Sequence, residues 1–479
     1  MSALDISRLI GLCLVFYWQY KRTGVFFLPS SVLLLINIIL AIYVAYPLAT
    51  SPESLSTIGQ TRHFRTIQWG ADEVLGIATI GVVCALMAYV AAGLLGTRLV
   101  RVFARSASAP RSISMNEAVM AACLTVFLAQ GYVFYTFYRA GSLPLFSSDP
   151  LYWRFALAKN LGGSLYLGAL TVSGIAITFL LAAIALRKVR SYRLLGLIAI
   201  GLTCFTSLST ATRSAFLGPF VSAGLIYFSA KEKKLTFPRT LAICAGLLVL
   251  AAGLQAIRYK SAFSWGETED EILYGDTFFA NFRDTSWTIA YFEADRYDFV
   301  HGKTILAGLL GFLPHDESSF RSQYRWGTFA LHVVGNDDPS THAGLAHVLF
   351  ADWYVNFGYM GVVIEGLILG LVLRFFDERL LYIRNSAKNL KQFDCYAAFK
   401  TWSWCGVATA LMSSAGAPFA YPQIAGLLAI GGFAAAFHKI SQGLRAVVHL
   451  PPRSVPLPLM DAQIPSARTA PSHPGRSHP

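Results

Sequence analysis

The chain has 479 residues, of which 55% are hydrophobic and 14% are charged, and its net charge is +13. Soluble domains carry about 25% charged residues, so the composition excludes a soluble globular protein and predicts an integral membrane protein. The Lys and Arg residues gather in short stretches between apolar runs, which indicates topology determinants and argues against a nucleic-acid-binding surface.

The apolar runs follow one another along almost the whole chain. Because about twenty apolar residues cross a bilayer as a helix, these runs predict about eleven transmembrane helices. The spans are 4–20, 25–48, 72–96, 116–138, 161–186, 194–212, 213–229, 240–257, 344–373, 396–416 and 421–438. The expected fold class is an all-α polytopic membrane protein in which 194–229 forms a tight helical hairpin.

Basic residues in short loops set the orientation, because Lys and Arg concentrate on the cytoplasmic side. The basic connections alternate with the spans, at 21–22, 98–111, 187–193, 231–239 and 374–391. This pattern predicts an outer N-terminus, a cytoplasmic C-terminus and a long outer loop. We expect Arg374, Asp377, Glu378 and Arg379 to form a solvated cytoplasmic helix end.

Four regions follow from this layout. Residues 1–257 are expected to hold about eight transmembrane helices and 344–438 about three, by the twenty-residue criterion. Between them lies the outer loop 258–343, and residues 439–479 are expected to be a disordered cytoplasmic tail rich in Pro, Ser and Arg.

The long outer loop is the main candidate for chemistry, because connections of this length are uncommon unless they have a function. It holds seven Lys and Arg against thirteen Asp and Glu, together with many aromatic residues. Segment 276–294 has helical spacing, and 303–314 is apolar but too short to span, which predicts an interfacial or re-entrant segment. Such a loop suits a substrate that is half lipid and half polar; the alternative is a folded cap over the helices.

Two arginines at the outer ends of spans stand out. Arg213 lies between two apolar spans and Arg258 ends the span 240–257. A guanidinium near the membrane marks function and fits phosphate oxygens, although either residue could instead anchor its helix at the headgroups. Glu365 and Asp352, within or beside the span 344–373, are expected to be structural.

Metal and nucleotide chemistry find little support in the sequence. The first outer loop holds Glu53, with Asp72 and Glu73 at the next helix start, and lacks the spaced acidic pair of many metal-dependent membrane glycosyltransferases. The cytoplasmic segments contain no phosphate-binding or dinucleotide motif. We therefore predict no metal and no cofactor, and a donor other than a cytosolic nucleotide sugar.

Two stretches resemble a known family, the O-antigen or oligosaccharide repeat-unit polymerases (Wzy-type). The segment Trp353 to Gly366 contains the Asn356-Phe357-Gly358 run and is similar to the family's helix after its large periplasmic loop. The turn from Thr210 to Phe216, which carries Arg213, resembles the family's Ser/Thr-rich turn bearing an arginine.

The resemblance implies a GT-C-like membrane glycosyltransferase of the bacterial inner membrane. Such enzymes polymerise undecaprenyl-diphosphate-linked repeat units into a surface polysaccharide at the outer face, in contact with membrane lipids, and a chain-length-regulating membrane protein is a further candidate partner. The expected diphosphate contacts are Arg213, Arg258, Arg283, Arg321 and Arg325. The candidate catalytic bases are His315, His342, Glu293 and Asp295.

The sequence also fits other functions. A ligase of the same superfamily, which moves finished polymer onto a lipid acceptor, shares the layout and the arginine chemistry. A flippase or secondary transporter is the non-enzyme alternative, but transporters place polar groups in mid-membrane on broken helices in repeated halves. The apolar span interiors here favour an enzyme that acts at the outer face.

Overall fold

The computed structural model describes residues 3–23, 27–38, 64–95, 113–141, 143, 164–189, 191–210, 213–230, 246, 285–286, 288–294, 297–311, 319–333, 348–387, 392–413 and 416–448. Every regular element in these ranges is a helix. Among them, five are long and apolar enough to cross a membrane: Glu73–Leu94, Met115–Arg139, Leu165–Ala185, Ala351–Asn385 and Ala417–Gln442. The predicted all-α class with membrane-spanning helices is confirmed, whereas the larger number of spans stays a prediction.

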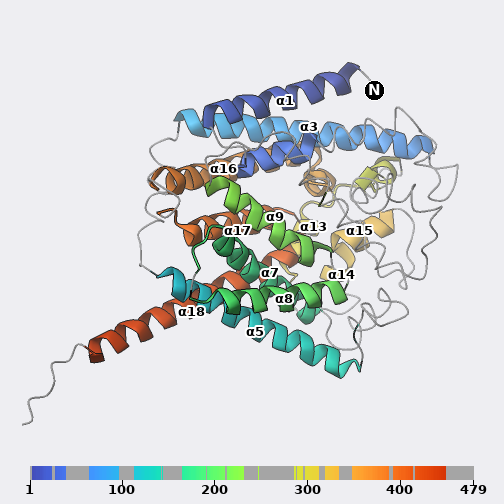
Figure 1. The fold of residues 1–479 in the computed structure, drawn as a ribbon. Helices are drawn as coiled ribbons and strands as arrows, with labels where there is room; N and C mark the ends of the chain where they lie inside the picture. The colour runs from blue at the N-terminus through green and yellow to red at the C-terminus, as the bar shows by residue number, and fades with distance from the viewer. Residues whose placement is uncertain are drawn as a thin grey trace, which may run out of the picture. The chain divides into compact units, whose positions relative to one another are not determined.

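Figure 1 labels the helices in chain order. The N-terminal half contains α1 (Ala3–Thr23), α3 (Phe64–Leu95), α5 (Met115–Arg139), α7 (Ser164–Ala185), α8 (Arg193–Ser209) and α9 (Arg213–Ala230). Three short helices follow, α13 (Lys303–Leu309), α14 (Phe320–Tyr324) and α15 (Trp326–Val333). The chain continues with α16 (Ala351–Asn385), α17 (Cys395–Leu411) and α18 (Ala417–Val448). A further short apolar helix covers Pro29–Ile38.

The chain divides into two compact units, Met1–His438 and Lys439–Pro479. The first unit holds two large apolar cores. One core is built mainly from α5, α7, α8, α9, α17 and α18, and the other from α3, α15 and α16.

Small residues let α3 and α16 pack closely. Gly366 and Gly370 lie one turn apart on α16, and a Cβ at these positions would come within 2.5 Å of the Gly81 carbonyl oxygen and 2.1 Å of the Ala85 carbonyl oxygen. This small-xxx-small spacing is typical of membrane helix pairs, because it lets the two backbones approach. Gly366 meets Gly81 and Gly370 meets Ala85, so residue numbers rise in the same direction along both helices, and α3 and α16 run parallel.

Polar side chains join helices inside the first core. Gln130 on α5 donates to Ser173 on α7 at 2.9 Å, and it accepts a hydrogen bond from Thr206 on α8 at 2.8 Å. All three side chains are buried. Such interhelical hydrogen bonds stabilise membrane bundles, because lipid offers these groups no partner.

Contacts between helix ends agree with the alternating orientation. His438 Nδ1 on α18 lies 3.2 Å from Glu117 Oε2 on α5, and both ends are predicted to be cytoplasmic. Trp353 Nε1 on α16 donates at 2.7 Å to the carbonyl of Met412, and both are predicted to be near the outer side. These contacts favour the alternation, while the sidedness of the termini stays a prediction.

Candidate functional site

Helix α16 breaks at Gly358. This glycine has φ +61° and ψ −153°, a combination that only glycine adopts without strain. The carbonyls just before the break accept hydrogen bonds from outside the helix: Val355 from the amide of Val300 at 3.1 Å, and Asn356 from the amide of His301 at 3.1 Å. These two hydrogen bonds therefore hold the segment before α13 against the first turns of α16.

Two phenylalanines fix this junction by packing on glycines. A Cβ at Gly358 would lie 3.1 Å from Phe299 Cζ, and a Cβ at Gly302, which has φ +85°, would lie 3.2 Å from Phe357 Cζ. Each ring thus occupies the space that the opposite glycine leaves open. The Asn356-Phe357-Gly358 run of the sequence resemblance is the part of α16 that forms the junction.

A buried polar set ties α13 to α16. Thr304 Oγ1 donates to Asp352 Oδ1 at 2.5 Å, and Asn356 Nδ2 donates to Thr304 Oγ1 at 2.5 Å. All three side chains are at most 1% exposed. Buried polar groups are costly unless they are hydrogen-bonded, so this set holds α13 in one position against α16. The expected structural role of Asp352 agrees with these contacts.

Two carboxylates meet two tyrosines beside the break. The Tyr354 hydroxyl donates to Glu293 Oε1 at 2.5 Å and lies 3.5 Å from Glu73 Oε1. The Tyr359 hydroxyl donates to the same Glu73 oxygen. Tyr354 is 4% exposed and Tyr359 is 44% exposed, so the cluster is closed on one side and open on the other. We call Glu73, Glu293, Tyr354 and Tyr359 the acidic cluster.

Three basic side chains gather on α13 and α14. Lys303 Nζ lies 4.9 Å from the centre of the Tyr324 ring, a cation–π arrangement. Arg321 and Arg325 lie one turn apart, and burial followed by the charge of Arg325 lowers the pKa of Arg321. The ordinary arginine pKa is far above neutral, so the Arg321 guanidinium keeps its charge despite this lowering. We call Lys303, Arg321 and Arg325 the basic cluster.

The structure describes some of the predicted site residues. Glu293 lies in the acidic cluster, while Arg321 and Arg325 lie together in the basic cluster. Arg213 is the first residue of α9, and its side chain lies outside the described part. The remaining candidates also lie outside the described residues: Arg258, Arg283, Asp295, His315 and His342.

The sequence interpretation missed the role of Glu73. Its only signal was the Asp72-Glu73 pair at the start of a span, and nothing local indicates that this position meets Tyr359, 286 residues away. Within the described ranges, no three His, Cys, Asp or Glu side chains come together in a way that could hold a metal ion.

The opposite end of α16 corrects one expectation. Arg374, Asp377, Glu378 and Arg379 were expected to form a solvated helix end, but α16 continues to Asn385, with Asp377 0% and Arg374 5% exposed. The solvated interpretation is wrong for these two residues, because other helices supply polar partners.

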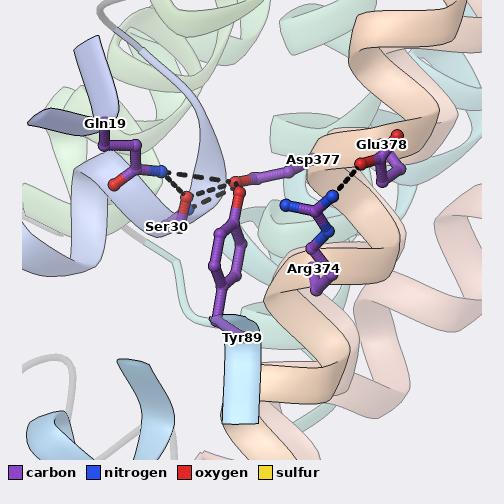
Figure 2. Close-up of polar contacts among 6 residues, drawn as sticks. All are labelled: Gln19, Ser30, Tyr89, Arg374, Asp377 and Glu378. Carbon is purple, nitrogen blue, oxygen red and sulfur yellow. Dashed lines mark hydrogen bonds and ion pairs between the residues drawn. The ribbon is translucent and has the colours of Figure 1, made fainter. Parts of the chain in front are cut away.

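Figure 2 shows the partners of the Asp377 carboxylate. It accepts hydrogen bonds from the Tyr89 hydroxyl at 2.8 Å, from the Ser30 amide at 3.3 Å and from the Ser30 hydroxyl. Gln19 Nε2 lies 3.5 Å away, and Arg374 pairs with Glu378 while its guanidinium lies 5.0 Å from the Tyr89 ring centre. One carboxylate thus joins α1, the Pro29–Ile38 helix and α3 to α16. We call Gln19, Ser30, Tyr89 and Asp377 the Asp377 cluster.

Comparison with known proteins finds a family similar to part of the chain. Residues 164–390 match the family model of the O-antigen polysaccharide polymerase Wzy, which covers the α7–α9 region, the long loop and α16. No curated protein and no solved structure matches the chain. The match favours polymerisation of O-antigen repeat units over the ligase and transporter alternatives. The resemblance predicted from the sequence is thereby confirmed: residues 164–390 are similar to the O-antigen polysaccharide polymerase (Wzy) family.

Proposed function

We propose that this protein is a polymerase that transfers the growing oligosaccharide from its lipid diphosphate to a hydroxyl of a newly arrived lipid-linked repeat unit, using the two clusters beside the α16 break. The observation that carries this proposal is the Glu293 carboxylate, held at 2.5 Å by the Tyr354 hydroxyl within the family's matched region. A carboxylate fixed by a tyrosine of a rigid helix is suited to a positioned catalytic base.

The reaction needs one bond to form and one to break. The acceptor hydroxyl oxygen attacks the anomeric carbon of the growing chain, and the bond from that carbon to the diphosphate oxygen breaks. The diphosphate leaves with the bonding electron pair, and the hydroxyl proton passes to Glu293. General-base help of this kind contributes about 10²–10⁴-fold. Asp295, His315 and His342 are alternative bases for the same step.

Positive charge would stabilise the departing diphosphate. Arg321 and Arg325 offer planar guanidinium groups that bind phosphate oxygens in a bidentate manner, and Lys303 adds a third cation from α13. Arg213, Arg258 and Arg283 are proposed to contact the same diphosphate. Because a lipid diphosphate is already a good leaving group, we propose that these cations replace a metal ion in catalysis.

The site is proposed to lie at the outer face of the bacterial inner membrane. The Lys and Arg distribution supports an outer N-terminus and a cytoplasmic C-terminus. In this orientation the acidic cluster, beside the first residue of the span Glu73–Leu94 and the first turns of α16, lies toward the compartment where a lipid-linked repeat unit arrives. A chain-length-regulating membrane protein is a proposed partner.

Reconstitution tests this function directly. Purified full-length protein is mixed with synthetic undecaprenyl-diphosphate repeat units in the absence of nucleotides, with and without EDTA. We expect a ladder of products in both reactions. An extract of the parent cells serves as the control for the substrate. If the extract polymerises the substrate and the purified protein does not, the polymerase proposal is overturned. A ladder that disappears only with EDTA would overturn metal independence alone.

A further inference from the structure

An apolar groove runs along α3 between α1 and the Pro29–Ile38 helix. One cavity of about 260 Å³ is lined by Arg8, Gly11 and Val15 on α1 and by Leu75 to Leu86 on α3. A second cavity of about 530 Å³ continues along α3 to Leu94. Both cavities are lined by Val15 and Leu86, so they adjoin and form one groove.

The groove is about as long as the hydrocarbon core of a bilayer is thick. From Leu75 to Leu94, at about 1.5 Å per residue, it extends about 28 Å, close to the hydrocarbon thickness of about 30 Å. Its walls are mostly aliphatic, with Arg8 at one end and Trp18, Gln19 and Tyr89 toward the other. Thr79 and Asn37 also line it, but their side chains donate to Leu75 and Leu33 on their own helices, at 2.6 and 2.8 Å.

The two ends of the groove differ. Gln19 and Tyr89 line the far end, and both contact Asp377, so the Asp377 cluster fixes that end. Val15 and Leu86 line the same part of the groove, and Gln19 and Tyr89 both line its far end, so α1 runs parallel to α3. Arg8 therefore lies at the opposite end, toward Leu75. Leu75 is only two residues beyond Glu73, so this end of the groove lies at the same level along α3 as the acidic cluster.

We propose that this groove binds the polyprenyl chain of the newly arrived lipid-linked repeat unit, the acceptor, with the acceptor's diphosphate at Arg8. The inference rests on the proposed function. The positive charge of Arg8 complements a diphosphate, the aliphatic walls favour a hydrocarbon chain, and the charged end lies on the same side as the acidic cluster. A chain seated in this groove would have its sugar at the end of α3 that carries Glu73.

Photolabelling without any sugar transfer tests the groove. The full-length protein in nanodiscs is irradiated with a benzophenone-bearing undecaprenyl diphosphate, and the labelled peptides are identified by mass spectrometry. We expect labels on α1 and α3 that unlabelled undecaprenyl diphosphate displaces and phosphatidylglycerol does not. Equal displacement by phosphatidylglycerol, or labels confined to other helices, would show that the groove holds ordinary membrane lipid.

Matched glycine substitutions make this test specific. A Cβ at Gly11 meets no atom within 4 Å, so Gly11→Trp places an indole in the groove without a backbone clash. Excluding about two methylene groups of the lipid should weaken probe binding about tenfold. Gly201 on α8 has the same open surroundings, and Gly201→Trp should leave labelling unchanged. An equal loss in both variants would contradict the proposal.

The head group is tested separately with Arg8→Gln. This variant should lose affinity for undecaprenyl diphosphate and keep its affinity for undecaprenol, which has the same hydrocarbon chain but no charge. The Arg8→Lys variant keeps the positive charge and should lose less affinity for undecaprenyl diphosphate than Arg8→Gln. The readouts also separate the two proposals. If a product ladder forms but no label is found in the groove, the groove proposal is overturned and the polymerase proposal is not. If the groove is labelled but no ladder forms, the polymerase proposal is overturned and the groove proposal is not.

Discussion

The Tyr89 hydroxyl on α3 donates a hydrogen bond to Asp377 Oδ2 on α16, at 2.8 Å, and both side chains are buried. Gln19 on α1 and Ser30 on the Pro29–Ile38 helix contact the same carboxylate (Figure 2). The three helices that line the groove therefore share one anchor on α16, which also carries the break beside the two clusters. The geometry of the groove depends on this hydrogen-bonded anchor.

Removal of the Tyr89 hydroxyl should destabilise the protein. In Tyr89→Phe the buried Asp377 carboxylate loses a donor, and the free energy of unfolding in detergent should fall by about 1 kcal/mol. Equilibrium denaturation followed by tryptophan fluorescence measures this change. Tyr138 on α5 is 84% exposed, so Tyr138→Phe should have no measurable effect. Equal stability of the two variants would show that the anchor contributes nothing.

Gly358→Ala should cost both stability and activity. Alanine at φ +61° is strained by about 1–3 kcal/mol, and its Cβ would lie 3.1 Å from Phe299 Cζ. The strain should straighten the break and separate the acidic cluster from the segment before α13. We expect a lower melting temperature and a lower polymerisation rate.

Gly76→Ala on α3 provides the matched control for this change. A Cβ at Gly76 meets nothing within 4 Å, and alanine is the better helix former by about 1 kcal/mol. This variant should keep full activity and gain slightly in stability. If Gly358→Ala behaved in the same way, the break would have no role in the site.

The sequence predicts local features of this molecule well and distant pairings poorly. Apolar runs predicted the five membrane-spanning helices that the structure describes, and the Asn356-Phe357-Gly358 motif lies at the break in α16. The burial of Asp377 could not be predicted, because its partners Gln19, Ser30 and Tyr89 lie 288 to 358 residues away. Glu73 was missed for the same reason: a carboxylate at a helix start looks solvated until its partner helix is known.

Neutralising the acidic cluster should slow catalysis without unfolding the protein. Glu293→Gln keeps the hydrogen bond from Tyr354 but removes the base, so kcat should fall about 10²–10⁴-fold. Glu73→Gln should also lower kcat, and the double variant should lose less than the product of the two single effects, because the residues share Tyr354. Initial rates of repeat-unit consumption measure all three variants.

Asp298 supplies the control for this series. It is an exposed carboxylate of the same loop, and Asp298→Asn should keep the rate of the unmodified protein. A Glu293→Gln variant with full activity would exclude Glu293 as the base and move the assignment to Asp295, His315 or His342. Strictly multiplicative losses in the double variant would show that Glu73 and Glu293 act independently.

The basic cluster should act mainly through substrate affinity. In Arg321→Gln and Arg325→Gln a charge-assisted contact to the diphosphate is lost, so KM for the lipid-linked repeat unit should rise about tenfold in each variant. Arg321→Lys should recover only part of this loss, because lysine cannot form the bidentate contact. Arg139→Gln at the end of α5 is the matched control, since this arginine bonds a tyrosine of its own helix. Steady-state kinetics over a range of ionic strength measure these effects, and an unchanged KM in both variants would remove Arg321 and Arg325 from the diphosphate site.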